Sequence, residues 1–398
     1  MSTNNLSDPI VIASYARTPM GALQGALGGV KSSALGATAI KAAIERAGVA
    51  KDSVDQVIMG CVLPAGQGQA PARQAALGAG LPNSVAAVTV NKMCGSGMQS
   101  VIQATDALIA GSADIIVAGG MESMTNAPYL LPKHRSGTRM GHDVVQDSMF
   151  LDGLEDAYQT GKLMGVFADE IARDYQMTRE AQDDYTIRSL TRAKEAIASG
   201  AFKREMAPVT IEGKGGNVVV DTDEAPGKAK PEKIRELKPA FAKDGTVTAA
   251  NASSISDGAA ALVVTRESVA KKNKLPIVAK IVATAVHAHE PAKFGTAPVP
   301  AMKKVLAKAG WSVGDVDLFE VNEAFAVVAM VAQSELQIPV DKLNVNGGAC
   351  ALGHPIGASG ARVIATLLGA LENRKLKRGV ASLCIGGGEA TAVALELA

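Results

Sequence analysis

The sequence is poor in aromatic residues, in cysteine and in net charge, and each shortage excludes a class of protein. Only 3% of its 398 residues are aromatic, and 40 Lys and Arg against 39 Asp and Glu leave a net charge of +1. A chain with so little net charge has no overall field that would attract nucleic acid or an anionic membrane surface. Its four cysteines are too scattered for a disulfide framework, and none forms a C-x-x-C pair. We therefore expect reduced thiols, no metal and no nucleic-acid partner.

Long apolar runs and targeting segments are also lacking. No stretch reaches the roughly 20 apolar residues that a membrane span needs. The opening MSTNNLSDPIVIASYARTP resembles neither a secretory signal nor an Arg-rich presequence, and the final ELA is not the peroxisomal SKL. No GxxxxGK[ST] or GxGxxG motif lies between a predicted strand and helix, so nucleotide hydrolysis and NAD binding find no support. We expect a cytosolic protein that does not bind membranes.

Glycine is plentiful, with 41 residues, and the sequence repeats itself. Segment 39–58, AIKAAIERAGVAKDSVDQVI, is similar to segment 301–320, AMKKVLAKAGWSVGDVDLFE, and each predicts a helix, a glycine stop, a turn and a strand. Segments 88–123 and 343–390 then both predict strand, glycine-rich turn, helix, strand and glycine-rich turn. One apolar face marks each of these helices: Met98, Val101, Ile102, Thr105, Leu108 and Ile109 in the first copy, and Val363, Ile364, Leu367, Leu368 and Leu371 in the second.

These repeats predict an α/β protein made of two related halves. We place the first half at 1–120 with 250–275, and the second at 276–398. Residues 121–249 are rich in Pro, Gly, Lys and Asp, and contain one clear helix that starts at Thr178 and stops at Gly200. Long loops of this kind usually provide binding surface or subunit contacts, so we interpret 121–249 as an inserted domain.

Cys94 lies between a predicted strand and a predicted helix, in NKMCGSGMQS. The positive end of a helix dipole favours a thiolate there, but by only ~0.3–1 kcal/mol, which is less than one pKa unit. A base or cation must therefore assist a nucleophilic Cys94. Gly95 and Gly97 would let backbone N–H groups approach a ligand. The sequence leaves open the alternative that Cys94 is a small buried packing residue.

The second half supplies polar groups at corresponding positions. His354 follows a glycine-rich turn, Cys384 ends an apolar strand in CIGGG, and Asn322 ends another in VNEAFA. If the two halves pack about a pseudo-twofold axis, their strand ends converge. Two thiols, an imidazole and an amide would then meet, as nucleophilic catalysis requires.

This arrangement resembles the thiolase family. The similar motifs are NKMCGSGMQS, VNEAFAV, NVNGGACALGHPIGASGAR and CIGGG, together with GGMESMTNAPY and GTVTAANASSISDGAAAL, and they span nearly the whole chain. The resemblance implies two duplicated α/β halves that form a layered α-β-α-β-α core with an inserted loop domain. It also implies a reversible Claisen condensation of two acetyl-CoA to acetoacetyl-CoA and CoA, with CoA as substrate and no cofactor.

The resemblance also implies a role for each motif. Cys94 would carry the acyl group as a thioester, and His354 would activate it. Cys384 would be the general acid and base that moves the α-proton. Asn322, through a water, and His354 would stabilise the enolate, whereas the backbone N–H groups of Cys94 and Gly386 would bind the acyl carbonyl.

Substrate contacts are also implied. Ser253 and Phe325 would line the pantetheine tunnel, and Lys228 and Lys230 would contact the CoA phosphates, unless they belong to a solvated charged loop. Leu163, Met164 and Phe294 would close a short acyl pocket, although Phe294 is also similar to members that accept a 2-methyl branch. The inserted region with His134 and His142 implies a homotetramer.

Several alternatives remain. A β-ketoacyl synthase would need no second thiol like Cys384, and a non-catalytic acyl-CoA or lipid carrier would have lost reactive residues. A thiolase of broader chain length or 2-methyl-branched specificity is not excluded. Glu389 and Ala390 depart from the family pattern, which more often has Met or Gln and then Gly at these two positions. The sequence therefore does not determine how side chains pack behind Gly386. His287 and His289 could face one metal, but no third ligand is in register.

Overall fold

The first half of the chain forms one side of a large central sheet. In the computed structural model, which describes residues 7–213 and 215–398, the strands lie in the order β4-β3-β5-β10-β1. β3 runs parallel to β4 and β5, whereas β10 is antiparallel to β5 and β1. The segment that follows the insertion therefore returns to the middle of this sheet. The strand bounds are β1 Ile10–Arg17, β2 Gly21–Ala22 (paired with β10), β3 Gln56–Gly60, β4 Ala86–Val90, β5 Ile115–Ser123 and β10 Ser256–Arg266.

The second half repeats this arrangement. Its strands lie in the order β11-β14-β13-β12, with β12 parallel to β13 and β14 antiparallel to both β13 and β11. Leu343 forms a parallel bridge with Phe319 of β12, in the place that β4 takes in the first half. Val11 and Ile12 of β1 pair with β11, so the two halves share one sheet edge. The bounds are β11 Ala279–Ala288, β12 Leu318–Val321, β13 Arg378–Ile385 and β14 Glu389–Leu397.

The predicted helix-and-strand repeat is confirmed in both halves. Helix α1 (Ser32–Ala47) ends at Gly48, whose φ is 66°, and β3 follows after one turn of 3₁₀ helix. Helix α8 (Pro298–Ala309) ends at Gly310, whose φ is 71°, and β12 follows in the same way. Glycine is favoured at both stops because a left-handed φ is costly for a residue with a Cβ.

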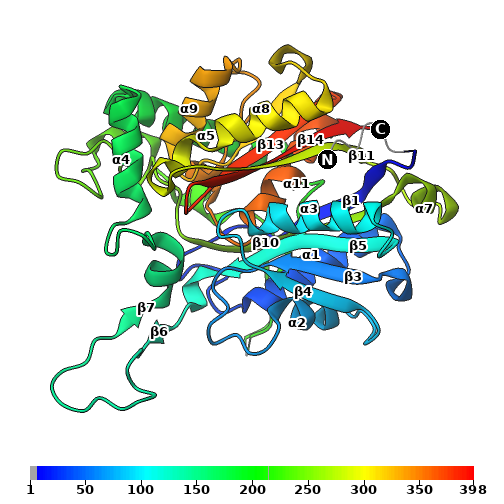
Figure 1. The fold of residues 1–398 in the computed structure, drawn as a ribbon, viewed down its shortest axis with the longest axis horizontal. Helices are drawn as coiled ribbons and strands as arrows, with labels where there is room; N and C mark the ends of the chain where they lie inside the picture. Colours follow the sequence, from blue (N-terminus) through cyan, green and yellow to red (C-terminus); the bar gives the residue numbers. More distant parts are fainter. Residues whose placement is uncertain (1–6, 214) are drawn as a thin grey trace.

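Helices and sheet form the expected α-β-α-β-α layers (Figure 1). Helices α3 (Ser96–Ile109) and α11 (Ser359–Arg374) lie in the middle layer, and one core cluster joins them to strands of both halves. Helices α1 and α2 (Pro71–Gly78) cover the outer face of the first half. Helices α8 and α9 (Ala326–Leu336) cover the outer face of the second. Because the sheets of both halves pack on α3 and α11, the strand ends of both halves lie next to the middle layer.

Helix α11 is more buried than its sequence indicates. Its apolar residues predict one buried face, yet every residue of 359–371 is buried. The reason is that α11 packs on α3 and on strands of both halves, so only its last turn, from Glu372 to Arg374, meets water. Arg362 and Thr366 are consequently inside the protein and need internal partners.

The insertion between β5 and β10 is made of short hairpins, helices and loops. The predicted helix is confirmed as α5 (Arg179–Ser199): Thr178 Oγ1 accepts a hydrogen bond from the Ala181 N–H, and the helix stops at Gly200. A second helix, α4, was not predicted from the sequence. The other elements are two 3₁₀ helices, Met124–Asn126 and Pro231–Glu236, with β6 Tyr129–Leu130, β7 Gln146–Asp147, a π-helical turn Phe150–Leu154, α4 Met164–Asp174, β8 Val209–Ile211, β9 Val218–Val220 and α6 Glu224–Lys228.

Hairpin β6–β7 extends away from the rest of the protein (Figure 1). In the loop that joins its strands, the His134 Nδ1 lies 2.9 Å from a carboxylate oxygen of Asp143. The remaining short helices are α7 (Glu267–Lys272) and α10 (Ala349–Leu352). Within the part of the chain that the structure describes, no helix combines the length and apolar character needed to cross a bilayer.

Candidate active site

Cys94 lies in the turn between β4 and α3 and is half-buried. At Met93 the backbone φ is 46°, a left-handed conformation that costs a residue with a side chain about 1–2 kcal/mol. Ser96 stabilises this turn, because its hydroxyl donates to the Met93 carbonyl at 2.6 Å and accepts from the Lys92 N–H at 2.8 Å. The strained turn presents Cys94 beside the second half of the molecule.

The groups around the Cys94 sulfur shift the pKa of its thiol in opposite directions. Burial raises the pKa of its thiol to about 11, and the negative charge of Glu122 acts in the same direction. Hydrogen bonds from the backbone N–H groups of Gly386 and of Cys94 itself lower the pKa. These two N–H groups come from different halves of the chain. The effect of burial on the pKa exceeds that of the two N–H groups, so the free thiol is protonated at neutral pH.

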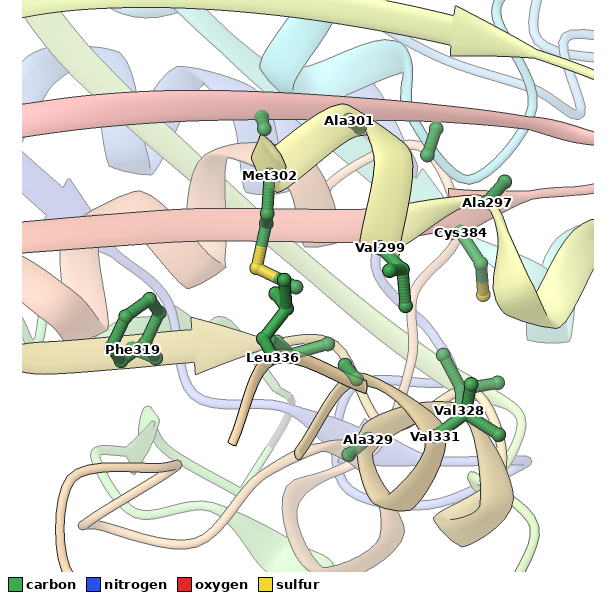
Figure 2. Packing of buried hydrophobic residues seen from close by; sticks show 14 of the residues in the cluster. Ala297, Val299, Ala301, Met302, Phe319, Val328, Ala329, Val331, Leu336 and Cys384 are labelled. Carbon is green, nitrogen blue, oxygen red and sulfur yellow. The ribbon is translucent and has the colours of Figure 1, made fainter. Parts of the chain in front are cut away.

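Cys384 lies close to Cys94 at the end of β13 and is almost fully buried. Burial raises the pKa of its thiol well above the usual value, and the neighbouring Cys94 raises it further. Figure 2 shows Cys384 beside Ala297 and Val299, within the apolar cluster under α8. Cys384 is therefore a neutral thiol in apolar surroundings.

His354 is held in one orientation and one tautomer by Ser359. Its Nδ1 lies 2.6 Å from the Ser359 Oγ, which also lies 3.0 Å from the Pro355 carbonyl oxygen. The carbonyl can only accept, so the single hydroxyl proton goes to it and the hydroxyl accepts from Nδ1–H. The other ring nitrogen, Nε2, is left without a proton. Burial and then the charge of Arg362 lower the pKa of His354 to about 3, so the ring is neutral and able to accept a proton.

Asn322 is fully buried next to His354 at the end of β12. Its Oδ1 accepts a hydrogen bond from Arg362 Nη2 at 2.9 Å, and its Nδ2 lies 3.5 Å from ring nitrogens of His354. Arg362 is itself paired with Glu320, at 2.8 Å. Because a guanidinium only donates, it directs the amide oxygen toward itself and the amide N–H groups toward the imidazole.

Four glycines let the His354 turn pack against the first half. A Cβ on Gly120 would lie 2.0 Å from the Gly357 carbonyl oxygen, and one on Gly60 would lie 2.7 Å from it. A Cβ on Gly97 or Gly360 would likewise meet backbone of the opposite half, at 2.7 or 2.2 Å. No side chain fits at these contacts, which explains the density of glycine in both motifs.

A buried carboxylate, Glu122, completes the joint between the halves. Its Oε2 accepts hydrogen bonds from the backbone N–H groups of Val62 and Gly357, both at 2.9 Å, and Oε1 accepts one from Leu63 at 3.3 Å. Burial raises the pKa of Glu122 to about 7, although these N–H groups favour the ionised form. Glu122 thus ties the His354 turn to the half that carries Cys94.

An apolar cavity of about 800 Å³ opens onto these groups. Cys94, His354 and Gly386 line it, and so do six of the predicted substrate residues: Ser253, Phe325, Met164, Phe294, Leu163 and Lys228. Asn322 and Cys384 are not among the lining residues, because both are buried behind its wall. The four reactive groups converge, but only one thiol and the imidazole face the cavity in this structure.

Aromatic and sulfur side chains narrow this cavity. The ring of Phe325 makes edge contacts with Phe241 and Phe294, at centroid distances of 6.1 and 6.2 Å. Met164 starts α4, and its sulfur lies 3.5 Å from the position that a Cβ would take on Gly386. Met164 therefore stands directly beside one of the two N–H donors.

Lys230 does not reach the main cavity. It lines a neighbouring one of about 340 Å³, together with Lys233 and Cys350, and Lys228 and Ser254 line both. Lys228 is engaged with Glu224, whose carboxylate lies 2.5 Å from its Nζ. The three lysines give this second cavity a positive character. Lys233 was not predicted, since only its place in the fold sets it beside the other two.

The remaining cysteines and histidines lie outside the cavity that Cys94 faces. Cys61 is buried in the first-half core, with its sulfur 3.6 Å from Glu122. His287 Nδ1 lies 3.0 Å from Lys304 Nζ, and His289 Nε2 lies 2.8 Å from a backbone carbonyl. Among the described residues, no three His, Cys, Asp or Glu side chains form a group that could hold a metal.

The residues that orient the predicted catalytic side chains were not identified from the sequence. Ser359 and Arg362 stand in the motif GHPIGASGAR, but they read as helix residues, and Glu122 stands in GGMES. The available signal was that polar side chains occupy an otherwise apolar strand and helix. Such residues are buried, and buried polar groups require partners.

A cysteine at the strand ends of one α/β half and an imidazole base at those of its duplicate are typical of enzymes that transfer acyl groups through a cysteine thioester. Comparison with protein families identifies the family of such enzymes that this chain matches. Residues 10–268 match the thiolase N-terminal domain, and residues 275–397 match the thiolase C-terminal domain. The chain belongs to the thiolase family, and the predicted resemblance and fold class are confirmed.

Relatives cover nearly the whole chain. The sequence is 49% identical over 393 residues to an acetyl-CoA acetyltransferase of Thiocystis violacea, covering 98% of this chain and 100% of the relative. It is 50% identical over 391 residues to acetyl-CoA acetyltransferase 2 of Arabidopsis thaliana, covering 98% and 97%. The crystal structure of the Bacillus anthracis acetyl-CoA acetyltransferase superposes with a TM-score of 0.96 at 40% identity, covering 98% and 99% of the two chains.

Proposed function

We propose that this thiolase is an acetyl-CoA C-acetyltransferase, which condenses two acetyl-CoA to acetoacetyl-CoA and CoA and also runs the reverse thiolysis. The names of its relatives support this activity. The observation that carries it is that Cys94, whose sulfur accepts two N–H groups from different halves, lines the same cavity as the neutral imidazole of His354 and has a second thiol nearby. CoA is substrate and product, and the proposal includes no cofactor.

In thiolysis, the Cys94 sulfur attacks the C3 carbonyl of acetoacetyl-CoA while Nε2 of His354 takes its proton. With pKa values of about 11 and about 3, a preformed thiolate and imidazolium pair is strongly disfavoured. Proton transfer must therefore accompany attack, which is general-base catalysis. The negative oxygen that develops lies between the N–H groups of Cys94 and Gly386. Loss of one such donor typically costs about 10²–10³ in rate.

The C2–C3 bond then breaks, the acetyl group stays on Cys94, and the enolate of acetyl-CoA leaves. Cys384 gives the enolate its proton at C2, because its raised pKa keeps it protonated until a strong base appears. Asn322, through a water, and His354 stabilise the enolate oxygen. The CoA thiol finally takes the acetyl group from Cys94: its proton passes to the Cys384 thiolate, the Cys94–acetyl bond breaks, and the Cys94 sulfur recovers the proton that His354 holds. In condensation the same groups act in reverse, and Cys384 removes the α-proton.

The cavity supports a short acyl substrate carried by CoA. Met164 and Phe294 occupy the space beside the reacting groups, whereas Ser253 and Phe325 line the path along which pantetheine would lie. We assign the CoA phosphates to the cavity that Lys228, Lys230 and Lys233 line. The positive charge of the three lysines fits this assignment. On CoA binding, Lys228 would replace its ion pair with Glu224 by one with a phosphate.

The protruding hairpin supports assembly into a homotetramer. Met140, Val144 and Val145 at its tip are 88%, 68% and 56% exposed, which is unusual for apolar side chains of a soluble domain. We propose that they pack against other subunits. Light scattering on the chain and on a variant that lacks 132–145 tests this, and an unchanged subunit number would refute it. A cytosolic location stays a prediction.

The deciding experiment follows acetoacetyl-CoA consumption on addition of CoA, beside 3-ketohexanoyl-CoA and 2-methylacetoacetyl-CoA. Rapid loss of the C4 substrate, abolished in Cys94→Ala and reduced at least 10²-fold in His354→Ala, is expected. Comparable turnover of the C6 or branched substrate would favour a thiolase of broader specificity. CoA binding without any turnover would indicate a carrier instead.

A further inference from the structure

Glu389, which departs from the family pattern, forms an ion pair with Lys92 across the joint between the two halves. Lys92 is in the turn before Cys94, and Glu389 starts β14 directly after the loop 386–388. Their side chains are 23% and 34% exposed, so the pair is partly shielded from solvent. The residue that sequence analysis left unexplained therefore has a partner next to the nucleophile.

Both ends of this ion pair are rigidly connected to an N–H donor. The Lys92 carbonyl accepts the Gly95 N–H at 3.0 Å, which closes a turn around Cys94. On the other side, Glu389 pairs with Ile385 in the hairpin β13–β14, and the Gly388 carbonyl accepts the His289 N–H at 2.9 Å. A Cβ on Gly388 would lie 2.4 Å from the His289 carbonyl oxygen, so this loop is tightly fixed.

The two turns touch at a second point, on the other side of Cys94. A Cβ on Gly95 would lie 2.3 Å from Ile385 Cδ1, so the Ile385 side chain fills the space over Gly95. That contact limits how closely the turns approach, but an apolar contact has little directional preference. The ion pair adds a directional link between the same two turns.

We propose that Lys92 and Glu389 are a positioning pair, which sets the separation between the Cys94 and Gly386 N–H groups that receive the acyl oxygen. This inference rests on the proposed function. The two donors belong to different halves, so no covalent or sheet geometry within one half fixes their separation. A donor that is displaced from the developing oxyanion loses most of its effect on the rate.

A competing explanation is that the Lys92 charge acts directly on the Cys94 sulfur. The exchange variant Lys92→Glu/Glu389→Lys separates the two, because it restores an ion pair with the charges reversed. A positioning role predicts recovery in the exchange variant. A direct charge effect predicts that it stays as impaired as Lys92→Glu alone.

The experiment measures kcat and KM for acetoacetyl-CoA thiolysis and the rate of Cys94 alkylation by iodoacetamide. Lys92→Glu and Glu389→Lys should each lower kcat about three- to tenfold, since a partly exposed pair is weak but the donors it positions are not. KM and the melting temperature should change little, and the exchange variant should return to within twofold of the original kcat. Glu396→Lys is the matched control, because Glu396 is ion-paired to Arg378 at the far end of the same strand.

Single variants within 1.5-fold of the original, or an exchange variant as slow as Lys92→Glu, would overturn the proposal. Alkylation needs no turnover, so it separates this outcome from failure of the proposed function. If the original protein does not cleave acetoacetyl-CoA, the proposed function fails. The alkylation rates, which respond to the two N–H groups beside the sulfur, still report whether the pair positions them.

Discussion

Glu122 accepts a hydrogen bond from the backbone N–H of Gly357 at 2.9 Å, and this contact joins the two halves of the molecule three residues after His354. The imidazole belongs to one half and its thiol partner to the other. Their relative position therefore depends on groups that cross the joint. Glu122 does so from within the core, and its carboxylate faces N–H groups and the Cys61 thiol.

Glu122→Gln should lower activity more than it lowers stability. An amide NH₂ in place of one oxygen would confront a backbone N–H, with a cost of about 1–3 kcal/mol in the free energy of unfolding. The His354 turn should shift in response, and we expect kcat to fall at least tenfold. Steady-state kinetics and thermal unfolding check this.

Asp169→Asn is the matched control for that variant. Asp169 is also buried and accepts two backbone N–H groups, from Thr246 at 2.7 Å and Val247 at 2.8 Å, but it contacts none of the reacting groups. Both N–H groups donate to Oδ1, and Oδ2 has no hydrogen-bond partner among the described residues, so an amide with its oxygen at Oδ1 keeps both bonds. The substitution should therefore cost little stability and leave kcat within twofold. A kcat of Glu122→Gln that also stays within twofold would mean that Glu122 does not position the His354 turn.

Ser359→Ala should allow His354 to populate both of its neutral tautomers. Without the hydroxyl, Nδ1–H loses its acceptor, and the form with Nε2 protonated becomes populated. That form cannot take the Cys94 proton, so kcat should fall at least tenfold, while ¹⁵N shifts of the imidazole report the mixture. Ser14→Ala removes a buried hydroxyl that donates to a backbone carbonyl far from the site, and should leave kcat unchanged. An unaltered imidazole spectrum in Ser359→Ala would contradict the tautomer assignment.

The sequence predicted the groups that react better than the groups that orient them. Cys94 and His354 were expected to meet because the repeated pattern placed them at corresponding turns of the two halves, and both line one cavity; Gly386, which the resemblance implied, lines it too. Arg362 and Glu320 could not be paired from sequence: they are 42 positions apart, and only the stacking of α11 on the second-half strands brings them together. Lys230 lines the neighbouring cavity for a similar reason, since the path of a loop does not follow from its composition.

The alkylation of Cys94 should depend steeply on pH. Burial raises the pKa of its thiol to about 11 and lowers that of His354 to about 3, so neither group titrates between pH 5 and 9. The thiolate fraction, and with it the rate of reaction with iodoacetamide, should rise about tenfold per pH unit at both ends of this range and less steeply near pH 7, where ionisation of Glu122 raises the pKa of the thiol. A plateau beginning near pH 6 to 7 would instead show a stable thiolate and imidazolium pair in the free enzyme.

Met164→Ala should widen the acyl site. The Met164 sulfur lies 3.5 Å from the Cβ position of Gly386, and thus next to the carbonyl that the two N–H donors would receive. Removing it leaves room for additional methylenes, each worth about 10- to 200-fold in discrimination when a pocket fits closely. The ratio of kcat/KM for 3-ketohexanoyl-CoA to that for acetoacetyl-CoA should increase at least tenfold. Met177→Ala, on a methionine outside the cavity, should leave the ratio unchanged. If Met164→Ala slows both substrates equally, Met164 supports the site without limiting chain length, and the limit then falls to Phe294, whose ring packs against Phe325 on the same cavity wall.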